Sequence, residues 1–529
     1  MQVKELNIKR MMIWLLAISA LVRGILAAWL EFGNDEVYYW TYALYPDWSH
    51  FDHPPMVGWV IQLFSLNLLF DSEFFIRLAS VVIMTVNTYI IYRIGKDIKD
   101  AQTGFYAALL YTASIYAFVI TGVFIMPDTS LMLFWLLAFW MAVKSEKNQE
   151  LILFGLFAGL AMLSKYSGVF LWVGMGLYIL IFNRKQLKNP FLYLSLLISA
   201  LCCLPILYWN LQNNFISFSF HGERVGGGQL NFSTFGTEIA GEFLYNNPVI
   251  FVLAIIAIVA AFKGKINMEK FALRLVLCTA LPLIFTFLAF SLTRPTLPHW
   301  NAPAYILLIL LIACMLSEKN PMKEGGFKLP KGIVAALSVM LFVVVFGSIE
   351  IQTGFIPLDR HTEPEKLGRD DFTLDMYGWE QLEEKFAVLR EQKIAESLMN
   401  EEDGIVADEW FPLANLDYYV ARPLGMKVMG IGWPHNLHKY LWINEERGGF
   451  RKGENFWFLS DSHYFKRPEA LYPGGFESIE FIDTITIERC GKPAKNFFVY
   501  ACKGLIYMQP TVSELMAQRE AAKQKPNMP

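Results

Sequence analysis

Ionisable side chains gather in a few short segments that lie between long apolar runs. The segment 31–55, EFGNDEVYYWTYALYPDWSHFDHPP, contains Asp35, Glu36, Asp47, His50, Asp52 and His53. Further segments add Asp128 in MPDTS, Lys165 in LSKYSG, His221 and Arg224 in the stretch 210–246, and Arg294 and His299 in RPTLPHWNAP. Carboxylates beside cations suit a transfer reaction in which a base deprotonates an acceptor hydroxyl group and a phosphate leaves.

The acids among these residues also have ordinary explanations. Asp35 and Glu36 could be solvated loop acids, although Asn-Asp-Glu before Val-Tyr-Tyr-Trp is typical of the start of an interfacial amphipathic helix. Asp128 could be a first-turn acid that the helix dipole favours. No single acid decides between these explanations, whereas the convergence of several on one face favours a shared site.

The cations and aromatic residues leave similar alternatives open. Lys165 could extend from a helix end to lipid headgroups, and His299 with Trp300 could belong to an aromatic belt at the membrane surface. Tyr38 and Tyr39 could stack on a sugar ring or anchor the chain at the interface. Because ionisable groups at membrane depth are costly and usually functional, a site that collects them is favoured.

The elements that must position these residues are mostly membrane helices. Of 529 residues, 55% are hydrophobic and 18% are charged, and the mean hydropathy is +0.36. An ordinary globular protein is about 25% charged, so a long chain with so little charge predicts an α-helical polytopic membrane protein. The net charge of −3 excludes a polycationic nucleic-acid binder. The six cysteines have no CxxC spacing of the kind that zinc ribbons use.

Apolar stretches recur as far as residue 350, and each membrane helix needs about 20 mostly apolar residues. The sequence predicts about 11 spans, at 12–30, 75–95, 104–122, 129–144, 151–164, 167–183, 190–209, 247–262, 272–292, 300–316 and 331–350. The apolar segment 55–70 is interpreted as interfacial or re-entrant. With that interpretation most lysines and arginines of the loops fall on one side of the membrane, and an excess of these residues is typical of the cytoplasmic side. We therefore expect a cytoplasmic N-terminus and an outward C-terminal domain.

The composition changes abruptly after residue 350, and 28 of the 48 carboxylates follow it. Short β-like runs such as GIVADEW and SIEFIDTITIERC alternate with helical stretches such as WEQLEEKFAVLREQKIAESLM. This alternation predicts a soluble α+β domain. The expected divisions are a transmembrane domain at 1–350, a periplasmic domain at 351–508 and a polar tail at 509–529.

The soluble part contains two pairs of residues that could have a special role. His435 and His438 are three residues apart and could bind a metal, but the tryptophans nearby favour a place at the membrane-facing rim or in acceptor binding. Cys490 and Cys502 would lie on the oxidising side of the membrane, so a disulfide is allowed, although the sequence does not fix the pairing.

The segments around the ionisable residues resemble a known family. They are similar to bacterial GT-C glycosyltransferases of the dolichyl-phosphate-mannose–protein mannosyltransferase type, relatives of the aminoarabinose transferase that modifies lipid A. The matching runs, in order, are NDEVYYWTYAL, FDHPPMVGWVIQLF, FFIRLAS, YRIGKD, MPDTSLMLFW, LAMLSKYSGVFLW and RPTLPHWNAPAYI. The resemblance covers 12–316. It implies an inverting enzyme with a first outer loop of interfacial helices, which takes a sugar from a polyprenyl-phosphate carrier.

The resemblance also implies catalytic residues. Asp35 matches the first-loop acid of the family, the candidate for catalytic base or for positioning the acceptor, and Glu36 accompanies it. Asp128 matches the second-loop acid. Asp52 and His53 stand where the aminoarabinose branch has a Glu-Lys pair before Pro-Pro. His53 therefore replaces the cation only if it is protonated.

Binding residues follow from the same comparison. The residues expected to bind the donor phosphate are His53, Lys165, Arg294 and His299. The residues expected to bind the substrates are Tyr38, Tyr39, Asp52, His221 and Arg224. Some relatives bind a divalent metal near such carboxylates and histidines, so a metal is allowed at Asp52 and His299, but it is not predicted, and no other cofactor is expected.

The predicted function is that of an inverting hexosyl- or pentosyltransferase that moves a sugar from a polyprenyl-phosphate-linked donor to a lipid, glycan or protein acceptor. We expect it as a multi-pass protein of a bacterial inner membrane, in contact with membrane lipids and without a nucleic-acid partner. The rival interpretation is a transporter or flippase of a lipid-linked or acidic solute. A transporter would place its ionisable residues near the middle of the membrane and show an internal repeat, whereas here they crowd one face and no repeat is found.

Overall fold

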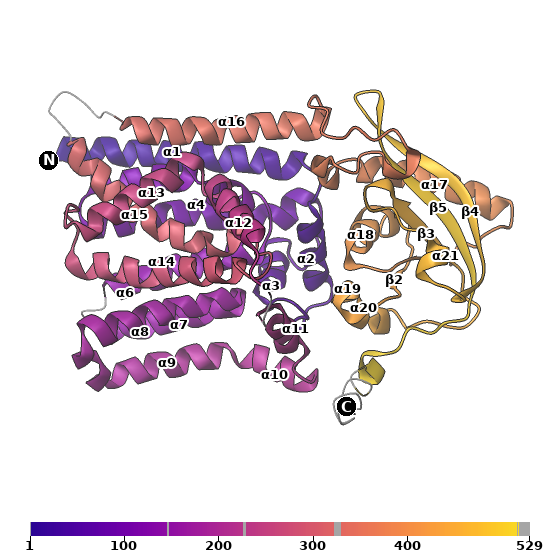
Figure 1. Ribbon diagram of the computed structural model, residues 1–529, viewed down its shortest axis with the longest axis horizontal. Coiled ribbons are helices and arrows are strands. Elements are labelled where there is room, and N and C mark those ends of the chain that lie inside the picture. The colour runs from indigo at the N-terminus through magenta and orange to yellow at the C-terminus, as the bar shows by residue number, and fades with distance from the viewer. Residues whose placement is uncertain (1, 145–147, 226–228, 322–328, 516, 518–529) are drawn as a thin grey trace.

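Long helices of the first 353 residues run side by side, and a domain with a β-sheet lies at one end of this bundle (Figure 1). The structure is a computed structural model that describes residues 2–144, 148–225, 229–321, 329–515 and 517; the side chains of 2–6 and 223–225 lie outside this description. The predicted fold class, a polytopic helical membrane protein with a C-terminal α+β domain, is confirmed.

The bundle is built from apolar helices of unequal length. They are α1 (Gln2–Trp29), α4 (Glu73–Ile98), α5 (Ala101–Ala113), α6 (Pro127–Val143), α7 (Asn148–Ser164), α8 (Phe170–Phe182), α9 (Pro190–Cys202), α10 (Leu204–Gln212), α13 (Pro248–Phe262), α14 (Lys270–Ser291), α15 (Ala302–Lys319) and α16 (Lys331–Thr353). Prolines open α6, α9 and α13, where the missing N–H would have no helical partner. Helix α15 is central, because 94% of the residues in its most apolar part are buried. The corresponding share is 22% for α16, which lies at the edge of the bundle.

Five helices among the described residues are long and apolar enough to cross a membrane. Two bent pairs, α9 with α10 and α13 with the helix before it, raise this number to seven if each pair is one span. Helices α6 and α7 and the segment Tyr166–Phe182 are apolar but shorter. The chain is therefore a multi-pass membrane protein, and the figure of 11 spans stays a prediction.

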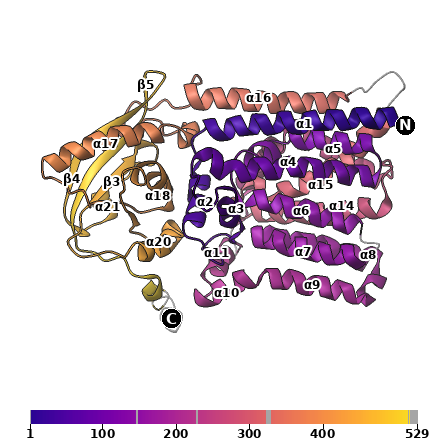
Figure 2. The same cartoon turned by 180° about the vertical axis from the view of Figure 1, so that it is seen from behind.

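Short helices cover the end of the bundle that faces the sheet domain, as both views show (Figures 1 and 2). They are α2 (Asn34–Leu44), α3 (Met56–Phe64) and α11 (Ile216–Val225). Helix α12 (Phe232–Tyr245) leads into α13 and forms the second bent pair with it. Helix α3 has nine residues, too few to cross a bilayer. The N-terminal end of α1 lies at the opposite end of the bundle, so the chain starts on the side away from the sheet domain.

The C-terminal domain is organised around a five-stranded mixed sheet in the order β2-β1-β3-β5-β4. Strands β1 (Gly404–Ala407), β2 (Val428–Gly430) and β3 (Phe456–Asp461) are parallel, whereas β4 (Phe476–Arg489) and β5 (Lys492–Leu505) form a long antiparallel hairpin. The helices are α17 (Trp379–Ala395), α18 (Trp410–Asn415), α19 (Pro434–Leu437), α20 (Tyr440–Glu446) and α21 (Pro468–Leu471). The boundaries at 350 and 508 stay predictions.

The allowed disulfide is not formed. Cys490 is exposed in the turn between β4 and β5, whereas Cys502 is buried on β5, and both are free thiols. Residue 502 pairs in register with Ile479 and Phe456 on the neighbouring strands, far along the hairpin from its turn. Of the predicted tail at 509–529, only 509–515 and 517 belong to the described residues.

Candidate active site

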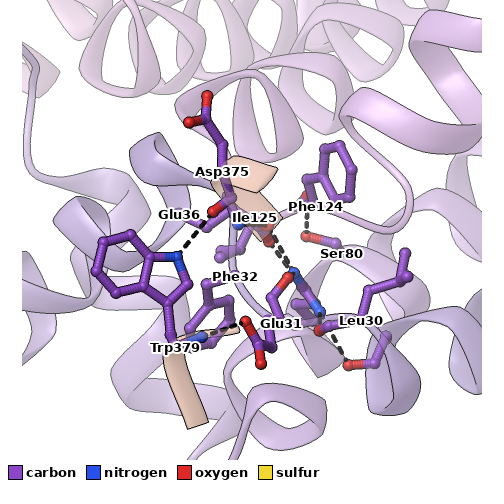
Figure 3. A network of polar contacts seen from close by, with 12 residues as sticks. Leu30, Glu31, Phe32, Glu36, Ser80, Phe124, Ile125, Asp375 and Trp379 are labelled. Atoms are coloured by element: carbon purple, nitrogen blue, oxygen red, sulfur yellow. Dashed lines mark hydrogen bonds and ion pairs between the residues drawn. The ribbon is translucent and has the colours of Figure 1, made fainter. Parts of the chain in front are cut away.

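Glu36 in α2 is held in a buried ion pair. Arg77 of α4 donates through Nε to Glu36 Oε1 over 2.7 Å and through Nη2 to Oε2 over 2.6 Å. The backbone N–H groups of Ile125 and Gly33 each donate to the same carboxylate over 3.0 Å. Figure 3 shows Glu36 beside Ile125 within this network. These contacts join α2 to α4 and to the segment just before α6.

Arg77 also closes the end of α1. It donates to the carbonyl oxygens of Ala27 over 3.2 Å, of Glu31 over 2.9 Å and of Leu30. Glu31 in turn accepts the backbone N–H of Trp379 over 3.0 Å, at the start of α17 (Figure 3). The network therefore connects the first outer loop to both the bundle and the sheet domain.

Asp35, the residue before Glu36, has a different environment. Its side chain is open to solvent, yet protein surrounds it closely. Burial, followed by the charge of Asp52, raises its pKa to about 6, and Lys165 opposes the rise. A carboxyl group that solvent can reach and whose pKa is near neutrality suits a general base.

Asp52 is fixed by tyrosines of α2. Tyr38 donates its hydroxyl to Asp52 Oδ1 over 2.8 Å and Tyr42 donates to the same oxygen over 2.5 Å. His221 of α11 contacts the Asp52 carbonyl oxygen through Nε2 over 2.8 Å. Burial alone would raise the pKa of Asp52, but His53 and the two hydroxyl groups contribute to holding it below its ordinary value. Asp52 is therefore ionised in the pH range, near 6, in which Asp35 gains or loses its proton.

Asp128 and Lys165 form a second buried ion pair. Lys165, between α7 and the turn Tyr166–Val169, donates from Nζ to Asp128 Oδ2 over 2.7 Å. Tyr116 donates its hydroxyl to Asp128 Oδ1 over 2.8 Å. His299 interacts electrostatically with both members of the pair. Because an ammonium group has more than one N–H donor, Lys165 can hold Asp128 and a phosphate oxygen together.

His53 lies within the same set of charges, but it is neutral near pH 7. Burial lowers its pKa to about 4, while Asp52 opposes the fall and Lys165 adds to it. Its ring lies 5.7 Å from that of Tyr39 and 6.5 Å from that of His221. The sequence-based condition for His53 as a phosphate-binding cation, its protonation, is thus not met in the protein without substrate.

The segment 293–301, which carries Arg294 and His299, is held by α12. Glu238 accepts the Thr296 hydroxyl over 2.7 Å. Glu242 accepts the hydroxyl of Tyr305 over 2.6 Å and a hydrogen bond from Asn301. Between these acids, Gly241 packs so closely that a Cβ atom there would lie 2.0 Å from Pro298 Cγ. Helix α12 therefore fixes where His299 stands.

The structure brings most of the predicted site residues to one place. Electrostatic interactions or contacts link Asp35, Tyr38, Tyr39, Asp52, His53, Asp128, Lys165, His221 and His299. Arg294 lies five residues before His299 on the same segment. The Arg224 side chain lies outside the described residues.

Sequence reasoning gave no role to several side chains that hold the site. Arg77 was visible as a lone cation in the apolar run FFIRLAS, and Tyr116, Glu238 and Glu242 were visible as polar groups beside apolar runs. Their partners could not be read from the sequence, because each contact joins separate helices. Lys439, from the sheet domain, also reaches the first outer loop.

A metal at Asp52 and His299 is allowed by the sequence but is not predicted, and no contact among the described residues tests it. Asp52 Oδ1 already accepts two tyrosine hydroxyl groups, and His299 interacts with Asp128 and Lys165. Among the described residues, the three His or Asp side chains with ligand atoms within 4.8 Å of one another are elsewhere, at Asp359, His361 and Asp370.

The fold is that of GT-C glycosyltransferases of the ArnT type, and the resemblance seen in the sequence is confirmed. A family model described as dolichyl-phosphate-mannose–protein mannosyltransferase matches residues 52–209. Together with the fold, this match supports a glycosyltransferase.

The chain is similar to individual proteins in fold and in sequence. ArnT from Cupriavidus metallidurans bound to undecaprenyl phosphate has a TM-score of 0.58 at 13% identity, covering 92% of this chain and 97% of that one. Its apo structure has a TM-score of 0.59. The lipid A galacturonosyltransferase RgtD of Rhizobium johnstonii is 21% identical over 405 residues, 75% of this chain and 81% of that protein.

Proposed function

We propose that this protein is an inverting glycosyltransferase that moves a sugar from a polyprenyl-phosphate carrier to a lipid acceptor of the lipid A class. The observation that carries the proposal is the gathering of Asp35, Asp52, Asp128 and Lys165 where the outer helices meet the bundle. The similar ArnT structure holds undecaprenyl phosphate and the similar RgtD is named for lipid A, which supports this donor and acceptor.

The site faces the outer side of a bacterial inner membrane in this proposal. The short helices α2, α3 and α11 are too short to cross, and they lie between the bundle and the sheet domain (Figures 1 and 2). A carrier with a long lipid tail could enter sideways between helices while its phosphate stays at this end. The sheet domain would then lie in the periplasm and the N-terminus in the cytoplasm.

Asp35 serves as the catalytic base or positions the acceptor. Its pKa of about 6 leaves it mostly ionised near pH 7 but still able to take up a proton. The acceptor oxygen attacks the anomeric carbon, its proton passes to the Asp35 carboxylate, and the bond from that carbon to the carrier phosphate breaks. If the acceptor is itself a phosphate, Asp35 only positions it. A single displacement of this kind inverts the anomeric centre.

The leaving carrier phosphate takes the bonding electron pair, and cations stabilise its charge. Lys165 can donate to it while it stays paired with Asp128. Arg294, on the segment held by α12, completes the cations on the phosphate side. His299 lies on the same segment, and because burial lowers its pKa to about 4, it contributes as a neutral hydrogen-bonding group. His53 contributes as a neutral hydrogen-bonding group unless the phosphate itself raises its pKa.

A test in liposomes separates transfer from transport. The purified full-length protein receives the polyprenyl-phosphate-sugar fraction of its source cells and lipid A, and the lipids are analysed by mass spectrometry. We expect glycosylated lipid A and free carrier phosphate in equal amounts. Asp35→Asn should form neither, whereas Asp97→Asn, at the far end of α4, should form both. Movement of the donor across the bilayer with unchanged mass would overturn the proposal.

A further inference from the structure

Two residues of the sheet domain reach into the first outer loop. His438 and Lys439 follow α19 and are 6% and 4% exposed. His438 has a φ of +50°, a backbone conformation that a residue with a side chain rarely adopts. Such a conformation persists only where the surroundings impose it, which often happens at functional positions.

His438 is stacked against the loop that carries Asp52. Its ring lies 5.0 Å from that of Phe51, at an interplanar angle of 30°, and 5.7 Å from that of Trp410, at 14°. Its Nδ1 atom lies 4.0 Å from Asp52 Oδ2. The two tyrosine hydroxyl groups bind the other carboxylate oxygen, Oδ1. The sheet domain therefore contacts the Asp52 carboxylate from the side that α2 leaves open.

Lys439 contacts the same loop and the tyrosines that hold Asp52. Its Nζ donates to the Tyr45 carbonyl oxygen and to His50 Nδ1, over 3.0 Å to the latter, and lies 4.8 Å from the centre of the Tyr42 ring. Its backbone N–H donates to the Tyr38 hydroxyl over 3.3 Å. Both tyrosines that bind Asp52 are thus contacted by one residue of the other domain.

The burial of Lys439 is costly for stability. Burial lowers the pKa of Lys439 well below its ordinary value, and burial likewise lowers the pKa of His50. A buried ammonium group is seldom the most stable choice, and an apolar side chain of similar shape is often as good or better. A role in placing other groups accounts for the residue better than stability does.

We propose that His438 and Lys439 are positioning residues of the transferase site, which fix Asp52 relative to the Asp35 carboxylate. Helix α2 carries Asp35 together with Tyr38 and Tyr42, so whatever fixes these tyrosines also fixes the distance between the two acids. The inference rests on the proposed function and deepens it. The sheet domain becomes a working part of the transferase site.

A pair of matched substitutions tests this role in the full-length enzyme. Lys439→Met removes the amino group that donates to the first outer loop, and Arg422→Met removes a cation that contacts Asp71 elsewhere on the same interface. The kcat of lipid A glycosylation, the KM for the donor fraction and the temperature of unfolding are measured for each. We expect Lys439→Met to lower kcat about tenfold or more, since small misplacements of reacting groups are costly. Arg422→Met should keep the kcat of the wild type.

His438→Phe provides a second test that keeps the ring stacking. We expect it to lower kcat in the same way while the KM changes less than about twofold, the pattern of an interaction felt in the transition state. For the first variant, Lys439→Met, the unfolding temperature should stay at or above that of the wild type, because burial of the lysine is costly. The inference is overturned if both variants keep their kcat, or if Arg422→Met loses as much as Lys439→Met. A wild type without transfer would instead overturn the proposed function.

Discussion

Arg77 and Glu36 form a two-pronged ion pair that is buried between α4 and α2, with N–O distances of 2.7 and 2.6 Å. The next residue toward the N-terminus, Asp35, faces a solvent-accessible space instead. Two adjacent acids thus have different tasks. Glu36 holds the helix in place, and in the proposed mechanism Asp35 meets the substrate.

Neutralising each acid in turn should separate these tasks. Glu36→Gln leaves the Arg77 guanidinium buried without its counter-charge, which typically costs about 3–5 kcal/mol. We expect a marked fall in the temperature at which the purified protein unfolds. Asp35→Asn should unfold at or above the temperature of the wild type, because it relieves the repulsion from Asp52, yet it should lose transfer. Equal stability of the Glu36→Gln protein would show that the ion pair does not hold α2.

The pH dependence of transfer should report Asp35. A base must be ionised to accept a proton, so the rate should rise as the pH increases through about 6, the pKa of Asp35, and then level off. Asp52 and His53 titrate below this range and should not set the rise. Lys165 lowers the pKa of Asp35, so Lys165→Met should move the rise to higher pH. A rise that stays in place in Lys165→Met would contradict the assignment.

Parts of this arrangement were predictable from the sequence because they are local. The apolar runs predicted membrane helices, and Pro127 before Asp128 predicted an acid in the first turn of α6. The break at Lys165 between α7 and the next helical turn follows from the same pattern. The interpretation of 55–70 as interfacial or re-entrant, made from the placement of lysines and arginines, agrees with the nine-residue helix α3.

Other parts were not predictable because they depend on distant partners. Glu36 and Arg77 are 41 residues apart, and His50 and Lys439 are 389 apart. Chain order does not reveal which of two adjacent acids meets an arginine. The stretch 210–246 contains the helices α11 and α12, which the sequence did not predict, and two acids of α12 support the segment with His299.

Binding of the carrier should depend on Lys165. Lys165→Met removes a charged donor, an interaction worth about 1.5–3 kcal/mol or roughly a tenfold to hundredfold loss of affinity. Native mass spectrometry with undecaprenyl phosphate measures this loss, and undecaprenol, which lacks the phosphate, should bind both forms alike. Lys144→Met, at the other end of α6 where Lys144 pairs with Asp97, is the matched control. Unchanged affinity in Lys165→Met would exclude it from the phosphate site.

Two glycines of α12 offer a test of how His299 is placed. A Cβ atom at Gly241 would overlap Pro298, whereas at Gly236 it would have no heavy atom within 4 Å. Gly241→Ala should shift the segment 293–301 and reduce carrier binding, with a cost of about 1–3 kcal/mol from overpacking. Gly236→Ala should bind as the wild type does and be slightly more stable, by up to about 1 kcal/mol. Equal binding by both variants would show that α12 does not place His299.

The central claim is transfer of a sugar to a lipid acceptor with Asp35 as the essential acid. Its most direct test is the mass of lipid A from source cells that lack the gene and carry wild-type protein, the Asp35→Asn variant or no protein. We predict that the wild type restores a lipid A species heavier by one sugar and that Asp35→Asn, present at the same level in the membrane, does not. The account is contradicted if lipid A is identical in all three strains, or if Asp35→Asn restores the heavier species fully.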